Sequence, residues 1–176
     1  MLIPRTPRRS RGVTLIEVLI GLVIMGILIA MAVPNFTGWI RNQRVRAAAE
    51  SLLNGLQTAR AEALKTNAVV NFRIETDRWK VVGRDNAEIQ SGQWSQVVVA
   101  ADRSSFCFNG MGRLVSPAGC GAGPGSISIS GTDGAGNCAA AGGRGETRCL
   151  RIEVNAGSGA RLCDPALPGS DTQGCK

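Results

Sequence analysis

One acidic residue stands in an otherwise uncharged apolar stretch near the N-terminus. Residues 13–33 comprise 21 positions with a single charge, that of Glu17. Inside a bilayer a carboxylate in such a segment costs about 2.5–3.5 kcal/mol. A charge at that cost needs a cationic partner, and the nearest choices are a terminal ammonium or a basic group of a neighbouring chain. Glu17 is therefore predicted to pair with such a cation, and a structural acid whose side chain reaches the membrane surface is the weaker alternative.

Six cysteines form the second group with chemical potential, and all lie in the C-terminal part of the chain: Cys107, Cys120, Cys138, Cys149, Cys163 and Cys175. An even number of cysteines in a small exported domain predicts disulfides. A zinc site is the alternative, but the chain has no histidine and no Cys-x-x-Cys pair. The spacing allows Cys163 to pair with Cys149 across a hairpin or with Cys175 around the tail, and leaves that choice open.

The chain lacks the residues that the common enzyme classes use. It has no histidine, no Gly-x-Ser-x-Gly and no Cys–His pair, and so offers no activated nucleophile. The glycine-rich segments 119–125 and 131–145 lack the Gly-Lys-Ser/Thr ending of a phosphate loop, and we interpret them as surface loops. We expect no catalytic activity, no metal and no cofactor.

The apolar stretch 13–33 is long enough to be a membrane-spanning helix. At about 1.5 Å per residue it would extend roughly 32 Å, the thickness of a bilayer's hydrocarbon. A signal peptide has a shorter apolar run of about 7–15 residues. The four arginines of residues 1–12 predict that this end stays in the cytoplasm and that the rest faces outward. Without them the net charge falls from +7 to +3, so charge argues only weakly for an anionic partner.

A second helical segment, 34–66, begins at Pro34 with a different pattern. Proline lacks a backbone N–H and is expected to bend the helix without ending it. Apolar residues then recur at alternating intervals of four and three: Val45, Ala49, Leu52, Leu56, Ala59 and Ala63. This spacing places them in one seam on a helix, which we expect to pack on the domain that follows. A free-standing coiled coil is the weaker alternative because the seam is short and rich in alanine.

Residues 67–176 are predicted to form one small, strand-rich head. Alternating apolar residues indicate two hairpins, 69–82 and 150–163. Further short strands are expected at 96–100, 105–108, 113–115 and 126–130. The fold class is therefore α+β. A long N-terminal helix, half membrane segment and half amphipathic, is expected to pack on a small antiparallel head closed by disulfides.

The stretch 11–17, Arg-Gly-Val-Thr-Leu-Ile-Glu, resembles the processing motif of type IV prepilins and type II secretion pseudopilins. The resemblance implies that a prepilin peptidase removes the leader by cutting between Gly12 and Val13, and that Val13 becomes N-methylated. Glu17 would then be the acid that the family uses in assembly, and Pro34 its helix-kinking proline. The resemblance also implies a single-pass protein of the inner membrane with a periplasmic head, which joins other pilins and moves to the pilus and cell surface.

A second resemblance covers the end of the helix and the end of the chain. Residues 50–67 and the closing Ala-Arg-Leu-Cys-Asp-Pro, 160–165, are similar to the FimT/FimU and GspH group of minor pilins and pseudopilins. This implies a minor type IV pilin in a complex that primes pilus assembly and supports twitching motility, adhesion or DNA uptake. A GspH-like minor pseudopilin of type II secretion is the alternative. The six cysteines and the Arg-Leu-Cys-Asp-Pro ending favour the pilin.

A DNA-binding receptor for natural transformation is the alternative of another class. FimT-type proteins that bind DNA carry Gly-Arg-x-Arg in the C-terminal hairpin, where this chain has Gly159 in place of the first arginine and retains Arg161. Arg144, Arg148 and Arg151 would supply nearby positive charge for phosphates. Acidic residues lie among them, and no aromatic residue follows Arg151 to stack on bases. A solvated surface of mixed charge is therefore favoured over DNA binding.

Overall fold

The structure is a computed structural model that describes residues 12–117, 120, 123–132, 148–157 and 159–175, without the side chains of 32–35 and 37. One helix and nine strands are found in this described part of the chain. The chain divides into two compact units, residues 1–37 and 38–176. The helix contributes to both units.

Helix α1 (Leu15–Thr66) begins with a capped first turn and continues through Pro34. The backbone N–H of Glu17 donates to the Thr14 carbonyl at 3.1 Å and lies 3.4 Å from the Thr14 hydroxyl. Threonine at the N-cap with glutamate three positions later is the pattern of a capping box, which satisfies N–H groups that have no partner within the helix. The beginning of the predicted helix is thus confirmed to within two residues. The bend at Pro34 stays a prediction.

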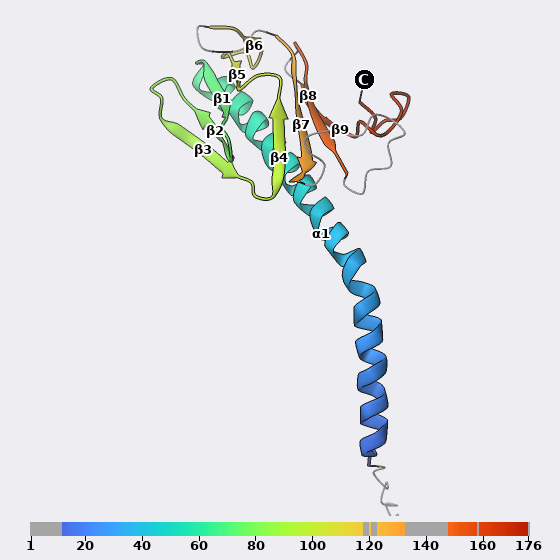
Figure 1. Cartoon of the computed structure of the whole chain (residues 1–176). Coiled ribbons are helices and arrows are strands. Elements are labelled where there is room, and N and C mark those ends of the chain that lie inside the picture. The colour runs from blue at the N-terminus through green and yellow to red at the C-terminus, as the bar shows by residue number, and fades with distance from the viewer. Residues whose placement is uncertain (1–11, 118–119, 121–122, 133–147, 158, 176) are drawn as a thin grey trace, which may run out of the picture. The chain divides into compact units, whose positions relative to one another are not determined.

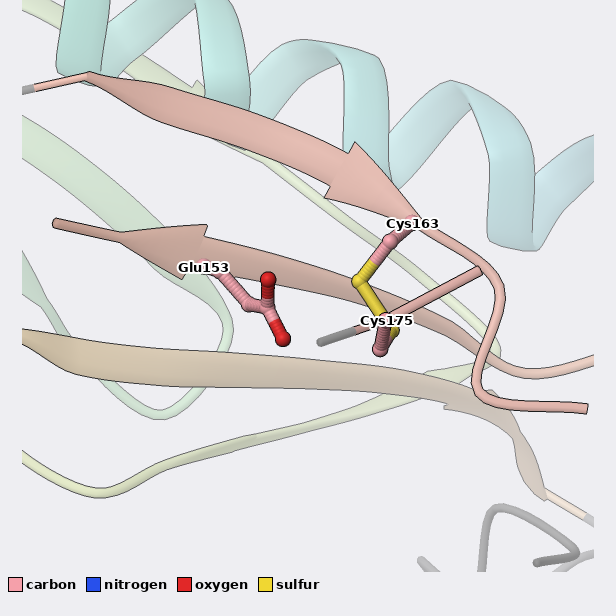
Figure 2. A group of neighbouring side chains, drawn as sticks. All are labelled: Glu153, Cys163 and Cys175. Carbon is pink, nitrogen blue, oxygen red and sulfur yellow. A yellow bond between two sulfur atoms is a disulfide. The ribbon is translucent and has the colours of Figure 1, made fainter. Parts of the chain in front are cut away.

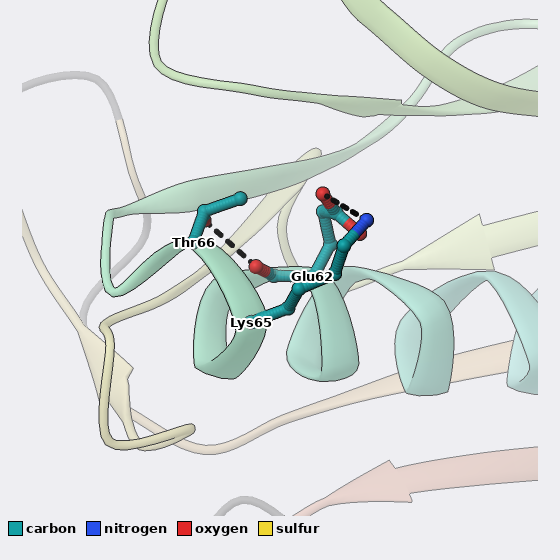
Figure 3. A network of polar contacts seen from close by, with 3 residues as sticks. All are labelled: Glu62, Lys65 and Thr66. Atoms are coloured by element: carbon teal, nitrogen blue, oxygen red, sulfur yellow. Dashed lines mark hydrogen bonds and ion pairs between the residues drawn. The ribbon is translucent and has the colours of Figure 1, made fainter.

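The other end of α1 lies where the sequence predicts it. Asn67 has a positive φ of 48°, and the N–H of Ala68 donates to the carbonyl five residues earlier. A left-handed residue with this hydrogen bond closes a helix C-terminus. Figure 3 shows the last turn, where the Thr66 hydroxyl donates to the Glu62 carbonyl at 2.7 Å and Lys65 pairs with the Glu62 carboxylate at 3.2 Å. The ammonium also complements the negative end of the helix dipole.

The N-terminal part of the chain exposes its apolar surface. From Val13 to Met31, every valine, leucine, isoleucine and methionine side chain is at least 50% exposed. Burying apolar surface is favourable by about 25 cal/mol per Å², so a contiguous surface of this kind is normally covered by another molecule. Among the described residues, no helix is both long and apolar enough to cross a membrane.

The C-terminal part of α1 forms one side of the core of the second unit. The six seam residues predicted from their spacing are all buried, none of them more than 1% exposed. Charged side chains cover the exposed face, including Arg46 and Glu50, which pair at 2.8 Å across one turn. The spacing therefore identified the buried face correctly. The seam packs on the head and does not form a free-standing coiled coil.

Two antiparallel sheets lie against this part of the helix (Figure 1). The first has the strand order β3-β2-β1-β5-β6, with bounds Glu88–Gln93, Arg78–Val82, Val70–Ile74, Ser105–Phe108 and Leu114–Val115. The second has the order β4-β7-β8-β9, with bounds Val97–Ala101, Gly125–Gly131, Leu150–Val154 and Ala160–Cys163. Side chains of both sheets, such as Phe72, Phe106, Ile127 and Ile152, form one apolar core with the helix.

Two glycines make room for a buried aromatic ring between the helix and the sheet. A Cβ at Gly55 of α1 would lie 2.7 Å from Phe72 Cε2 and 2.8 Å from Trp79 Cε3. A Cβ at Gly92 of β3 would lie 2.7 Å from Trp79 Cε2. The indole Nε1 donates to Ser51 Oγ at 3.0 Å, which fixes the ring further. Gly55 costs the helix about 1 kcal/mol relative to alanine, and the close approach of the rings explains why it is needed.

The predicted strands are all found, with ends shifted by at most one residue, but β3 was not predicted. β3 has one large apolar residue, Ile89, and lies at the edge of its sheet with mostly exposed side chains. Backbone pairing with β2 holds it there, so its sequence does not alternate. Of the two expected glycine-rich loops, 119–125 is described in part and most of 131–145 lies outside the described residues.

Candidate functional site

The predicted processing junction lies just outside helix α1. Residues 12–14 have no regular secondary structure, and Gly12 and Val13 are exposed, Val13 to 70%. The rest of the leader, 1–11, lies outside the described residues. Proteases cut exposed chain that is not held in a helix or sheet, so the bond between Gly12 and Val13 has the accessibility that cleavage needs.

Glu17 lies in the first turn of α1 with its side chain exposed. The positive end of the helix dipole favours a carboxylate at this position. Within the described part of the chain, the carboxylate has no ion pair and no hydrogen-bond partner. Among the described residues the acid therefore sits unpaired on an apolar surface.

Two disulfides are present among the described cysteines. Cys107 pairs with Cys120, and Cys163 with Cys175, with Cα atoms 5.9 Å and 5.0 Å apart. The alternative bridge between Cys149 and Cys163 is wrong. The Asn155 N–H donates to the Gly159 carbonyl at 2.9 Å where the last hairpin closes, and Arg151 lies opposite Cys163. The hairpin centre is thus one residue later than the bridge would require.

The other two cysteines are left without an observed bridge. Cys149 is buried and is the one described cysteine outside a disulfide. Cys138 lies outside the described residues. The expectation that all six cysteines form disulfides therefore stays a prediction for this pair.

The Cys163–Cys175 bridge closes a loop that Arg161 ties to the sheet. A terminal nitrogen of Arg161 donates to the Gly174 carbonyl at 2.7 Å, and its Nε pairs with Glu153 at 3.1 Å. The guanidinium is about one third exposed. Arg161, the residue retained from the DNA-binding motif, is thus engaged within the head, where it holds the C-terminal loop.

The structure describes two of the three other proposed DNA contacts. Arg148 pairs with Asp164 at 2.8 Å, and the Asp164 carboxylate is 7% exposed. Arg151 is half-buried on β8, and Arg144 lies outside the described residues. Arg148 and Arg161 are each paired with an acid, which partly neutralises the charge that they could offer to a DNA backbone.

A carboxylate and two sulfurs meet at the same place, yet they do not form a metal site. Glu153, Cys163 and Cys175 place one potential ligand atom each within 4.8 Å of one another. Figure 2 shows the Glu153 carboxylate beside the two sulfurs, which are joined in the disulfide. A metal binds cysteine as a thiolate, so oxidised sulfurs are poor ligands.

An acid with a shifted pKa lies at the turn between β1 and β2. Hydrogen bonds from Lys80 and then Arg78 hold the pKa of Glu75 below its ordinary 4.5. The same contact with Glu75 raises the pKa of Arg78. Both shifts move the pKa values away from 7, so neither group is suited to proton transfer near neutral pH. The cluster of Glu75, Arg78 and Lys80 is therefore interpreted as a structural contact of the hairpin.

Comparison with known proteins agrees with this architecture. Residues 7–33 match the prokaryotic N-terminal methylation motif, and residues 48–158 match the family described as type II transport protein GspH. No curated protein matches the sequence.

Solved structures are similar at low sequence identity. The type IV minor pilin FimU of Pseudomonas aeruginosa PAO1 has a TM-score of 0.51 at 17% identity, over 71% of this chain and 98% of its own. A second crystal form of FimU has a TM-score of 0.52 at 16% identity, over 73% of this chain and 95% of its own. The minor pseudopilin EpsH from the type 2 secretion system of Vibrio cholerae has a TM-score of 0.52 at 13% identity, over 70% of this chain and 99% of its own. These likenesses show a shared fold.

A long N-terminal helix packed on two antiparallel sheets with two disulfides defines the class as a pilin-like α+β protein. The GspH match spans more than half of the sequence, and the chain therefore belongs to the GspH family. It is a minor pilin or pseudopilin of the type IV pilus and type II secretion family, a structural subunit and not an enzyme.

Proposed function

We propose that this protein is a minor type IV pilin that joins other minor pilins in a complex priming pilus assembly. The observation that carries the proposal is the N-terminal segment, whose apolar side chains from Val13 to Met31 are exposed around one unpaired acid, Glu17. We expect lipid to cover this apolar surface before assembly, and neighbouring subunits to cover it in the filament. The head would face the periplasm while the helix is in the inner membrane, and the cell surface once in the filament.

Glu17 supplies the assembly mechanism. Cleavage after Gly12 leaves an ammonium on Val13, at the positive end of the helix dipole, where a cation is disfavoured. The Glu17 carboxylate of an incoming subunit pairs with the N-terminus of its neighbour. The pair removes two isolated charges from a medium of low dielectric constant, where an unpaired charge is expensive.

A Glu17→Gln variant tests this mechanism because it removes the charge and keeps the shape. The variant is expected to be cleaved and to remain in the membrane fraction, but to be absent from sheared filaments. The matched control is Glu62→Gln, which changes an acid of the same helix outside the apolar segment and is expected to assemble normally. The proposal is falsified if Glu17→Gln reaches the filaments at the wild-type level.

The type II secretion alternative is supported by a separate observation, the match of residues 48–158 to the family described as type II transport protein GspH. The two systems share the N-terminal features, so these do not discriminate between them. The six cysteines and the Arg-Leu-Cys-Asp-Pro ending favour the pilin. A deletion strain separates the two: loss of twitching motility with normal enzyme secretion supports the pilin, and the reverse supports the pseudopilin.

DNA binding remains the proposal of another class, and the engagement of Arg161 within the head argues against it. A gel-shift titration of the full chain in detergent tests it directly. Binding that weakens with salt and with Arg161→Ala would support a DNA receptor. The absence of binding at low salt would remove that role and leave the pilin proposal untouched.

A further inference from the structure

A groove of about 320 Å³ opens between the helix and the C-terminal loop of the head. It is lined by polar and apolar side chains, among them Asn42, Arg46, Arg148, Asp164, Val45 and Leu150. All of these residues belong to the unit 38–176. The assembly mechanism of the N-terminal segment makes no use of this groove.

Two arginines enter the groove with part of each guanidinium unused. Arg46 Nε pairs with Glu50 at 2.8 Å, and Arg148 Nε pairs with Asp164 at 2.8 Å. The terminal nitrogens of both residues have no acceptor among the described residues. Their side chains are 65% and 55% exposed, so these nitrogens are accessible to a molecule that enters the groove.

Contacts within the head hold both sides of the groove in place. The Arg148 backbone N–H donates to Asn42 Oδ1 at 3.1 Å, which ties the start of β8 to the helix. On the other side, the Asp164 N–H donates to a carbonyl of the C-terminal loop at 2.7 Å, and the Cys163–Cys175 bridge closes that loop. A site formed before binding loses little conformational entropy on binding, and so binds more tightly.

The groove is lined by two guanidinium groups and one carboxylate, that of Asp164, so one positive charge is left over and the free N–H donors fit a second carboxylate. A guanidinium presents planar pairs of N–H donors that match the two oxygens of a carboxylate. The apolar side chains of Val45 and Leu150 suit the methylenes of an acidic side chain. The volume lies at the lower end of ligand pockets, which suits a single side chain.

We propose that this groove binds a glutamate or aspartate side chain on the head of a neighbouring subunit. This docking contact rests on the proposed role as a pilus subunit. It adds to that role a recognition site in the head, separate from the N-terminal segment that all subunits of the filament share.

The first test measures carboxylate recognition with a defined probe. The full chain in detergent is titrated with acetyl-Ala-Glu-Ala-amide and followed by the backbone amide shifts of Asn42, Arg46 and Arg148. Saturable shifts at these positions are expected, with affinity roughly tenfold weaker for acetyl-Ala-Gln-Ala-amide and for Arg46→Gln. Arg44→Gln is the matched control, since Arg44 is an exposed neighbour that bonds to Gln96 and does not line the groove.

Three results of this titration would overturn the proposal. They are the absence of saturable shifts, equal affinity for the two peptides, and an unchanged affinity of Arg46→Gln. Inorganic phosphate that binds the same residues more tightly than the glutamate peptide would also overturn it, because the groove would then be a site for a free anion.

The second test separates the groove from the proposed function. In the native host, Arg46→Gln is expected to be processed normally but to enter filaments at a reduced level, roughly tenfold lower. If Arg46→Gln assembles fully while Glu17→Gln does not, the groove is refuted and the pilin function stands. If both variants assemble fully, the pilin mechanism itself fails.

Discussion

Replacing Gly55 by alanine is expected to destabilise the head, although alanine is the better helix former. The new Cβ would lie 2.7 Å from Phe72 Cε2 and 2.8 Å from Trp79 Cε3. Carbon atoms in contact normally lie about 3.5–4.0 Å apart, so the backbone or the rings must move by roughly 0.7 Å. Trp79 cannot move away freely, because Gly92 lies close to the other part of its ring and Ser51 accepts its N–H.

The expected magnitude follows from two opposing effects. Overpacking a buried site costs about 1–3 kcal/mol, and a ring confined on two sides belongs at the upper end. Alanine in place of glycine returns about 1 kcal/mol of helix propensity. The net loss is therefore about 1–2 kcal/mol. For a head of this size it lowers Tm by roughly 3–8 °C.

Thermal unfolding of the full chain in detergent, followed by tryptophan fluorescence, measures this effect. The control is Asn54→Ala, one position earlier on the exposed face, which gains helix propensity without a clash and should be neutral or slightly stabilising. If Gly55→Ala raises Tm as Asn54→Ala does, the packing argument is refuted.

Three further predictions concern the head. Because the pKa of Glu75 is lowered, its pairing with Lys80 stabilises the hairpin fully at pH values above the ordinary pKa of 4.5, and this stabilisation is lost as the pH falls through the lowered pKa. An NMR titration of the Glu75 carboxyl should give a midpoint below 4.5, and the midpoint should move upward in Lys80→Gln. Arg161→Ala should weaken the C-terminal loop by about 1–2 kcal/mol, seen as faster amide exchange there with the disulfide intact. Alkylation of the denatured, unreduced chain should label no cysteine, since Cys138 and Cys149 are expected to form a third bridge. A labelled Cys149 would contradict this.

The helix and most strands were predictable because each follows a local rule. The seam of α1 repeats at helical spacing over nineteen positions from Val45, so its burial follows from periodicity alone. The last hairpin shows the limit of such rules. Alternation located its two strands, yet the choice of disulfide depended on which residues close the turn: Cys163 faces Arg151, two residues beyond Cys149, and this excludes the bridge to Cys149.

The candidate functional residues also differ in whether a local sequence pattern could identify them. The roles of Gly12 and Glu17 could be predicted from the sequence because the processing motif is contiguous and its chemistry depends on neighbouring residues; both roles stay predictions. The groove was not predicted, since Arg46 and Arg148 are brought together by folding across a hundred residues of chain. Arg161 was selected by its position in the DNA-binding motif, and only its contacts with Glu153 and the C-terminal loop reveal its structural role.

The Cys163–Cys175 bridge makes the groove depend on when and where the chain is oxidised. Disulfides persist outside the cytoplasm and are reduced within it. A chain that has not yet brought Cys175 across the membrane lacks the closed loop that forms one side of the groove. Docking through the groove then becomes available only after translocation has passed Cys175. Export and oxidation would in this way determine the order in which subunits become competent to associate.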